Sequence, residues 1–238
     1  QYVNNVNITG NQSITEGEII RILRTNPSSY LSSTVYTNKK RKLDELSISS
    51  FYKSKGFLKA TVSSHASVIN NQVDIEYQIN EGACYKIKSI KFIGNRILLD
   101  NDLHEHFAIS LDSPLDIRKL KGSLKKLRSI YLGLGRINID ILDELVYDEY
   151  SNYIDLIINI YEGNEFIVSS IQIDGLKFIS KDFIKKYIEV KPNDIYNQKS
   201  INRSIINLLD TQLFSSIDIY PQVISENEVN VVIKGKEQ

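Results

Sequence analysis

The cluster His104-Glu105-His106 is the part of the sequence that most directly suggests metal binding. Imidazole nitrogens and a carboxylate are common zinc ligands. On a helix, however, side chains at positions i and i+2 point about 200° apart, so His104 and His106 cannot both face one ion. The remaining histidine, His65, stands alone and is expected to face solvent. We therefore expect no metal site and no cofactor.

An acidic run offers a second kind of chemistry, because paired carboxylates can transfer protons or bind calcium. The run consists of Asp140, Asp143, Glu144, Asp148 and Glu149. It lacks the Asp-x-Asp-x-Asp-Gly spacing of a calcium loop, and no pocket is evident around it. We interpret it as a solvated hairpin loop.

Nucleophilic catalysis has no support in the sequence. The single cysteine, Cys84, cannot form an internal disulfide and is expected to be a buried structural thiol. No Ser/His/Asp or Cys/His arrangement is evident, and the two glycines in Leu132-Gly133-Leu134-Gly135 suit the end of a helix better than a phosphate loop. The sequence therefore predicts a protein that is not an enzyme.

Two basic runs stand out against a chain of 238 residues with 29 basic and 29 acidic side chains. Lys39, Lys40, Arg41 and Lys42 precede one predicted helix. A second group decorates the polar face of another helix and comprises Lys119, Lys121, Lys125, Lys126 and Arg128. Charged solvent faces explain both groups, and contact with anionic headgroups or an acidic partner is the alternative. The zero net charge argues against nucleic-acid binding.

The elements that carry these residues recur with a period of about 80 residues, the mark of a repeat protein. An alternating stretch that ends in glycine opens each repeat, at residues 6–11, 90–95 and 171–176. Ile79-Asn80-Glu81-Gly82 recurs as Ile160-Tyr161-Glu162-Gly163, and Phe51–Phe57 resembles Ile130–Arg136. The chain therefore reads as three copies of one module.

Within each repeat, hydrophobic periodicity predicts the order strand, helix, helix, strand, strand. Thr15 with Glu18 predicts a capping box for a first helix, and Ser180 predicts an N-cap in the third repeat. The second helix is clearest at Leu120, Leu124, Leu127 and Tyr131, and again at Ile201, Ile205 and Leu208. In the first repeat it is less regular, with Leu43, Leu46, Ile48 and Phe51.

The last two strands of each repeat differ in pattern. Ile137, Ile139 and Ile141 alternate with polar residues, which predicts an edge strand. The stretch Tyr153–Tyr161 carries apolar residues on both faces, which predicts a central strand. Glycines at five positions are expected to make the turns, at Gly10, Gly56, Gly94, Gly135 and Gly175.

This combination of motifs resembles the POTRA (polypeptide-transport-associated) domains of the BamA/TamA superfamily of outer-membrane β-barrel assembly proteins. The resemblance rests on the I-x-I/F-x-G-N opening, the Tyr-x-x-x-Gly helix ends (Tyr52 to Gly56 and Tyr131 to Gly135) and the Glu-Gly closing pair. The third repeat departs from it, with Leu176 after its glycine and no Tyr-x-x-x-Gly.

The resemblance implies an α+β fold of three tandem small domains, at residues 1–82, 83–163 and 164–238. Each domain would have a three-stranded mixed sheet packed on two helices. It also implies a place in the periplasm of a Gram-negative bacterium, attached to the outer membrane through a barrel beyond residue 238. Expected partners are unfolded outer-membrane β-barrel proteins and accessory periplasmic lipoproteins.

An unpaired strand edge can accept another strand by β-augmentation. We therefore expect partner binding at the edge strands, at Ala60, Val62, Ile137, Asn138, Ile139, Asp140, Ile141, Ser216, Ile217, Asp218, Ile219 and Tyr220. Edge charges such as Asp140 and Asp218 instead discourage pairing. The alternative function is an interaction scaffold or a two-partner secretion module that docks one dedicated partner.

Overall fold

The structure is a computed structural model that describes residues 1–27 and 34–238. The first repeat contains β1 (Tyr2–Thr9), α1 (Glu16–Ile20), α2 (Asn38–Lys53), β2 (Thr61–Ile69) and β3 (Gln72–Asn80). The second contains β4 (Lys86–Ile93), α3 (Asp100–Glu105), α4 (Ile117–Gly133), β5 (Asp140–Tyr147) and β6 (Tyr153–Tyr161). The third contains β7 (Ile167–Asp174), α5 (Lys181–Lys185), α6 (Gln198–Asp210), β8 (Phe214–Val223) and β9 (Glu228–Glu237).

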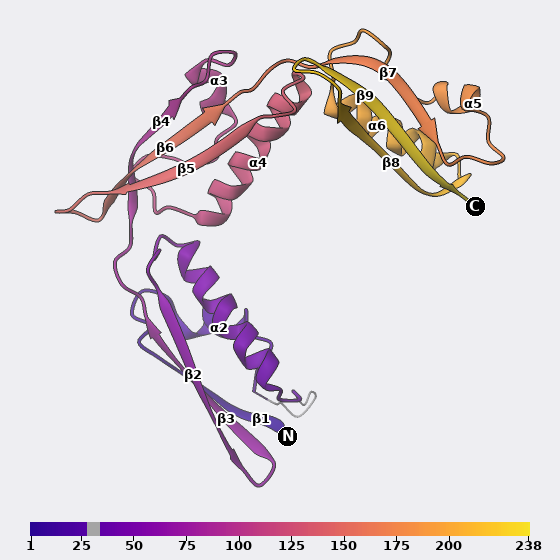
Figure 1. Cartoon of the computed structure of the whole chain (residues 1–238). Helices are drawn as coiled ribbons and strands as arrows, with labels where there is room; N and C mark the ends of the chain where they lie inside the picture. The colour runs from indigo at the N-terminus through magenta and orange to yellow at the C-terminus, as the bar shows by residue number, and fades with distance from the viewer. Residues whose placement is uncertain (28–33) are drawn as a thin grey trace. The chain divides into compact units, whose positions relative to one another are not determined.

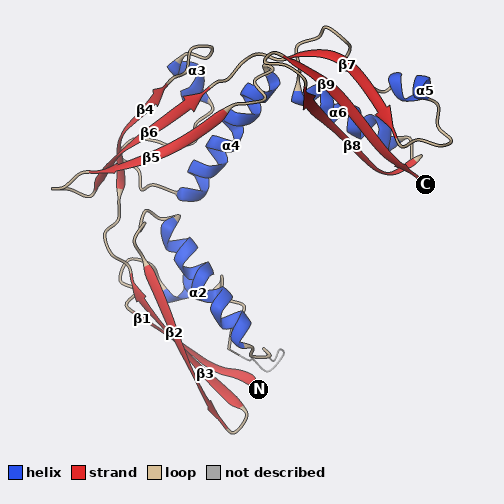
Figure 2. Ribbon diagram, viewed as in Figure 1, coloured by secondary structure: helices blue, strands red, loops and turns tan. Residues whose placement is uncertain are grey.

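Each repeat has one three-stranded sheet in which the last strand lies in the middle (Figures 1 and 2). The strand orders are β1-β3-β2, β4-β6-β5 and β7-β9-β8. In the first and third sheets the opening strand pairs parallel to the central strand, and the remaining strand pairs antiparallel to it. The predicted α+β fold, with mixed sheets and two helices per repeat, is confirmed.

The cores of the first and third repeats form between one sheet face and the long helix. In the first repeat, Ile48 and Tyr52 of α2 and Val73 and Ile75 of β3 are among the buried side chains. In the third repeat, Ile201 and Leu208 of α6 belong to the same core as Val231 of β9. The alternating burial of β3 and β6 follows the sequence pattern, because successive strand residues face opposite sides.

The predicted helix starts are confirmed at both caps. The Thr15 side chain accepts from the backbone N–H of Glu18, and the Glu18 carboxylate accepts from the Thr15 N–H, which completes a capping box. The Ser180 side chain accepts from the N–H of Phe183. These caps start helices of only five residues, which therefore depend on packing for stability.

Three expectations about these elements are wrong. The basic run 39–42 lies inside α2, which begins at Asn38 behind the Thr37 cap. Leu46 is 66% exposed, whereas Asp44 on the same helix is fully buried. Asp140, Asp143 and Glu144 lie in β5 and not in a loop. The residues after Gly135 first form a tight turn, so the strand starts later than predicted and includes these acids.

The described residues divide into two compact units. One comprises Gln1–Lys91, Ala108–Lys121 and Leu145–Leu156, and the other comprises Phe92–Phe107, Gly122–Glu144 and Ile157–Gln238. The predicted domain boundaries at 82/83 and 163/164 stay a prediction. No helix within residues 1–27 and 34–238 is both long enough and apolar enough to cross a lipid bilayer.

Candidate functional site

The two edges of each sheet differ in whether the backbone is already paired. The outer edge of the opening strand is paired only at its beginning, with a residue shortly before the long helix of its repeat, through the isolated bridges Tyr2↔Val35, Lys86↔Pro114 and Ile167↔Ile195. In the third repeat, the Val168 N–H donates to the Asp194 carbonyl at 2.8 Å. The other edge, formed by β2, β5 or β8, has no neighbouring strand in the described part of the chain. Within the described residues, β2, β5 and β8 are therefore the edge strands that no other backbone segment bridges.

The turn after β2 determines which of its backbone groups face outward. Asn70 and Asn71 both have positive φ, at 49° and 65°, and connect Ile69 directly to its partner Gln72. A two-residue hairpin of this kind closes on a hydrogen-bonded pair, so alternate residues from Ile69 backward bond to β3. The outward-facing amides and carbonyls then belong to Val62, Ser64, Ala66 and Val68.

The Arg41 side chain supports this assignment and also occupies part of the edge. One guanidinium nitrogen donates to the Ser64 carbonyl at 2.6 Å. The Ser64 hydroxyl donates to Glu45, which also forms ion pairs with Arg41 and Lys42. An incoming strand that pairs along the whole of β2 would have to displace this guanidinium.

The three free edges differ in the residues that oppose strand pairing. β2 contains no proline and no acidic or basic residue apart from His65. β5 carries Asp140, Asp143 and Glu144. β8 carries Asp218 and Pro221. Charged residues and proline on an edge discourage the addition of another strand, so β2 is the least protected of the three.

The structure places the predicted edge residues unevenly. Val62 and the group 216–220 lie within β2 and β8. Ala60 lies one residue before β2 and is buried. Residues Ile137, Asn138 and Ile139 precede β5, which begins with Asp140 and Ile141. Ile139 is buried and Ile137 packs against the core of the third repeat, so their apolar character serves packing.

The Glu-Gly pair that closes the first repeat has a structural role that the sequence did not reveal. The Glu81 carboxylate accepts hydrogen bonds from the Ser13 N–H at 2.9 Å and the Ser13 hydroxyl at 2.6 Å. It also accepts from the Tyr52 hydroxyl at 2.9 Å. One carboxylate thereby ties together the loop after β1, the end of α2 and the end of β3. We call such a glutamate, with the loop it binds, a glutamate clamp.

The second repeat repeats this arrangement, and the third keeps only part of it. Glu162 accepts from the backbone N–H groups of Arg96 and Ile97 and from the Tyr131 hydroxyl. Glu237 accepts from three successive N–H groups, those of Lys177 and Phe178 at 3.1 Å and that of Ile179 at 2.8 Å. Among the described residues, no tyrosine donates to Glu237. The tyrosine of the Tyr-x-x-x-Gly motif therefore donates to the clamp glutamate in the first two repeats.

These hydrogen bonds change the pKa values of the groups involved. Although burial opposes it, hydrogen bonds from Ser13 and Tyr52 hold the pKa of Glu81 below its ordinary value. The backbone N–H groups of residues 177–179 lower the pKa of Glu237. Burial, reinforced by the adjacent glutamate, raises the pKa values of Tyr52 and Tyr131 above the usual range. The clamp glutamates 81 and 237 are therefore charged at neutral pH.

Glycine is required where the opening strand passes the end of the central strand. Gly10 has φ of 81°, and a Cβ there would lie 2.0 Å from the carbonyl oxygen of Ile79. At Gly94 the corresponding distance to the Ile160 oxygen is 2.3 Å. The other predicted turn glycines, 56, 135 and 175, also have positive φ.

The remaining candidate residues gain no chemical role. Within the described ranges, no three His, Cys, Asp or Glu side chains are grouped so that they could hold a metal ion. His104 packs against the Phe92 ring, with 5.0 Å between centroids, and His65 is exposed on β2. Cys84 is half-buried, not fully buried as expected, and burial raises the pKa of its thiol.

A buried carboxylate on α2 is a second feature that the sequence did not reveal. Asp44 accepts from the Arg24 and Thr25 backbone N–H groups, each at 2.9 Å, and from the Thr25 hydroxyl at 2.7 Å. It also forms an ion pair with Arg24. Asp44 thus holds the segment after α1 against α2. Each of these contacts joins Asp44 to its own repeat, so we interpret Asp44 as a structural residue.

Comparison with known families gives three matches along the chain. The family model described as "POTRA: Surface antigen variable number repeat" matches residues 1–82, 85–163 and 166–238. A candidate outer membrane protein assembly factor from Treponema pallidum is 22% identical over 99% of this chain and 29% of its own length. The outer membrane protein assembly factor BamA of Buchnera aphidicola is 27% identical over 56% of this chain and 23% of its own. The chain thus spans less than a third of these relatives.

A solved structure shares the fold of the repeats and aligns with nearly the whole chain. The crystal structure of Haemophilus influenzae BamA POTRA3-5 aligns with a TM-score of 0.76 and 18% identity. It covers 99% of this chain and 96% of the solved one. At this level of identity the likeness shows the fold.

Proposed function

Because this chain belongs to the POTRA family, whose model matches it three times, we propose that it is the periplasmic part of an outer-membrane β-barrel assembly factor. In this role its free sheet edges bind unfolded client strands, accessory lipoproteins dock on it, and clients pass to a membrane barrel. The relatives named as assembly factors support this proposal.

The observation that carries the proposal is the open edge of β2. On this nine-residue strand, the backbone groups of Val62, Ala66 and Val68 face outward, Arg41 occupies the Ser64 carbonyl, and no acidic residue or proline interrupts the edge. An added strand gains main-chain hydrogen bonds whatever its side chains are, so one edge can receive many different clients. Transmembrane β-barrels are built from strands of roughly 10 residues. An unfolded barrel protein therefore contains many segments that can pair with such an edge.

Among the three free edges we assign the main client site to β2. On β5, an incoming strand would meet Asp140, Asp143 and Glu144. On β8, Pro221 lacks the N–H that an incoming strand would need, in keeping with the rule that strand prolines lie where the N–H would face solvent. β5 and β8 are then secondary sites or surfaces for folded partners.

The test is binding of a fluorescent peptide with the alternating pattern of a barrel strand to the 238-residue protein, followed by anisotropy. Ala66→Pro removes an outward-facing amide from β2 and leaves the bonds to β3 in place, and Ala66→Ser is the control that keeps the amide. We expect at least tenfold weaker binding for Ala66→Pro, which corresponds to about 1.4 kcal/mol, and little change for Ala66→Ser.

A second measurement covers the case in which the proline disturbs the repeat itself. In the unmodified protein, the peptide should slow hydrogen exchange at the amides of Val62, Ser64, Ala66 and Val68. Peptide binding without protection there, or equal binding by a folded Ala66→Pro protein, would rule out β2 as the site. Ile219→Pro tests the β8 edge in the same way, and a smaller effect is expected.

A further inference from the structure

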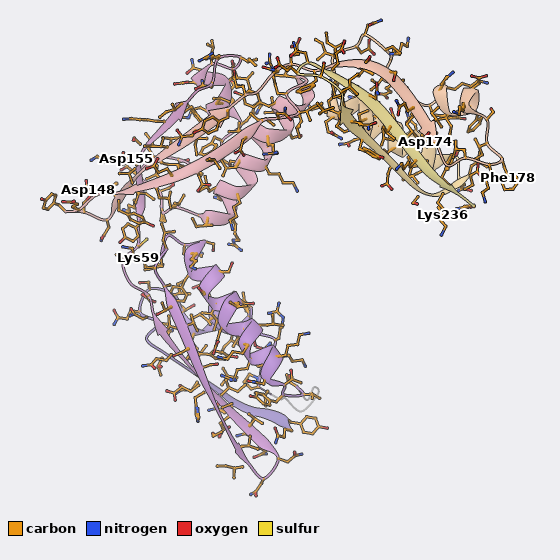
Figure 3. The ribbon with its side chains drawn as sticks, viewed as in Figure 1. Lys59, Asp148, Asp155, Asp174, Phe178 and Lys236 are labelled. Atoms are coloured by element: carbon orange, nitrogen blue, oxygen red, sulfur yellow. The ribbon has the colours of Figure 1, made fainter. Side chains whose placement is uncertain are left out.

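Phe178 is a large apolar side chain held in solvent. It is 89% exposed and lies on the loop of residues 176–180 between β7 and α5 (Figure 3). We call this segment the Phe178 loop. A phenylalanine ring stabilises a fold through the apolar area that it buries, and the exposed Phe178 ring buries very little.

The Phe178 loop is fixed by hydrogen bonds, so the exposure of the ring is built into the fold. The Glu237 carboxylate accepts from the N–H groups of Lys177, Phe178 and Ile179. Ile179, next to Phe178, turns toward the core of the repeat, and Ser180 caps α5. The backbone on both sides of Phe178 is therefore anchored while its side chain points away from the core.

The other two repeats show that this scaffold does not need an aromatic residue at this place. The same loop follows β1 and β4, and clamp glutamates bind it there as well. The residue three positions after the turn glycine is Ser13 in the first repeat, Ile97 in the second and Phe178 in the third. Ile97 is 39% exposed, less than half of the value for Phe178. The exposed ring is thus specific to the third repeat.

The charges around the Phe178 loop favour a negatively charged partner. Residues 176–186 contain four lysines and one acid, Asp182, which pairs with Lys185 at 3.3 Å. Glu237, which binds the loop backbone, adds a second negative charge, so the four lysines outnumber these two acids. A second highly exposed aromatic residue makes a useful contrast, because Tyr150 is 94% exposed but follows Asp148 and Glu149. The two exposed rings therefore lie in oppositely charged surroundings.

We propose that the Phe178 loop contacts an anionic lipid surface, with the Phe178 ring inserted at the headgroup level and Lys177, Lys181 and Lys186 facing the lipid phosphates. An apolar ring beside flexible cationic side chains is the composition that binds membrane interfaces. Each lysine near an anionic surface adds a salt-sensitive attraction. One ring and a few lysines give weak, reversible binding. This contact goes beyond client binding at β2, because it uses a different repeat and needs no strand pairing.

The absence of tryptophan from the sequence allows a direct test. Phe178→Trp places a single tryptophan at the tip of the loop, and Tyr150→Trp places one in the acidic hairpin as a matched control. On addition of phosphatidylglycerol vesicles, the emission of Phe178→Trp should shift to the blue and that of Tyr150→Trp should not. Neutral phosphatidylcholine vesicles, or inorganic phosphate alone, should shift neither.

Flotation with the same vesicles tests the unlabelled protein. Phe178→Ser introduces the residue that the first repeat carries and leaves the backbone clamp intact, so the fold should be retained. We expect about fivefold less protein bound to anionic vesicles, equivalent to about 1 kcal/mol. Lys177→Gln with Lys181→Gln should also weaken binding and reduce its salt dependence.

Two outcomes would overturn the proposal. One is the absence of a blue shift for Phe178→Trp on anionic vesicles at low salt. The other is equal flotation of the folded Phe178→Ser and unmodified proteins, which would leave the ring as a contact for a protein partner. Peptide binding at β2 is measured separately, so failure of the lipid contact is distinguishable from failure of the proposed client site.

Discussion

The first and third repeats have the same elements in the same order but stabilise and expose them differently. In the first repeat, Glu81 joins Ser13 and the Tyr52 hydroxyl within the repeat. In the third, Glu237 binds only the backbone of the Phe178 loop. The first repeat has the edge strand without acidic residues or proline, and the third has the exposed ring. The comparison teaches that the repeat preserves a backbone scaffold while each copy presents a different surface.

The long helices of the two repeats, α2 and α6, also carry different side chains at one buried polar position. Asp44 on α2 accepts from the Arg24 and Thr25 N–H groups after the first helix. The corresponding residue on α6 is Ser204, whose hydroxyl oxygen accepts from the Glu189 N–H at 2.9 Å. Both are fully buried. The position is polar in both repeats because it receives backbone groups that have no other partner in the turn after the first helix.

The largest difference between these repeats is expected for glycine substitution. Gly10→Ala brings a Cβ to 2.0 Å from a backbone oxygen, whereas a Cβ at Gly175 meets nothing within 4 Å. We expect a loss of more than about 3 kcal/mol in the first repeat for Gly10→Ala. Gly175→Ala should cost about 1 kcal/mol, since only its positive φ is unfavourable.

Hydrogen exchange at the central strands β3 and β9 reports the stability of each repeat separately. Similar losses for both alanine variants would show that the close contact at Gly10 is relieved by movement of the strand.

The clamp glutamates should also differ in strength. Glu81→Gln leaves an amide group facing the donors of Ser13 and Tyr52 and should lower the free energy of unfolding of the first repeat by about 2 kcal/mol. Glu237→Gln should have a smaller effect on the third repeat, because its partners are accessible to water. Tyr52→Phe, which removes one hydroxyl, is the control and should cost about 1 kcal/mol. Denaturant titration followed at each repeat measures these values, and a larger effect at Glu237 would contradict the comparison.

Acid should weaken the first repeat through Glu81. Its pKa in the folded protein lies below the ordinary value of 4.5, so its stabilising contribution is complete above about pH 4.5 and is lost as pH falls through the lowered pKa. Glu81→Gln should therefore flatten the dependence of first-repeat stability on pH below about pH 4.5. An unchanged slope in the variant would assign the acid sensitivity to other carboxylates.

The smallest expected effect concerns the protected edge of β8. Pro221→Val together with Asp218→Thr removes the two features that separate it from β2. We expect binding of the strand peptide to increase about threefold through β8, with β2 unchanged. Ile217→Val, a conservative change on the same strand, serves as the control. No increase would mean that proline and charge do not explain the preference for β2.

Much of the fold could be predicted from the sequence because the sequence patterns that indicate it are local and occur three times. Alternation at Ile154, Leu156, Ile158 and Ile160 predicted the central strand, and these four residues are buried in the structure. The capping box of Thr15 and Glu18, the Ser180 cap and the turn glycines depend on neighbours within a few residues. The less regular helix in the first repeat also had a local cause, since the buried position there is Asp44 and not an apolar residue.

The candidate site was predictable in outline only. The apolar and polar alternation identified the edge strands, but it placed the start of β5 too early and assigned Ala60 and Ile139 to the edge, although both are buried. In the first and second repeats, the turn after the long helix buries one residue, Ala60 or Ile139. Over three residues, such a turn shows the same alternation of apolar and polar residues as a strand. The pattern is too short to separate the two.

The sequence by itself determined the repeat, the order of elements and the central position of the last strand, because periodicity follows from side-chain direction along one element. Only the tertiary structure decided the role of Glu81, which binds Ser13 across 68 residues of chain. It also decided which sheet edges are bridged by a residue shortly before the long helix, and that Phe178 is held in solvent. Each of these depends on which backbone groups remain unpaired after folding, and that is a property of contacts between distant residues.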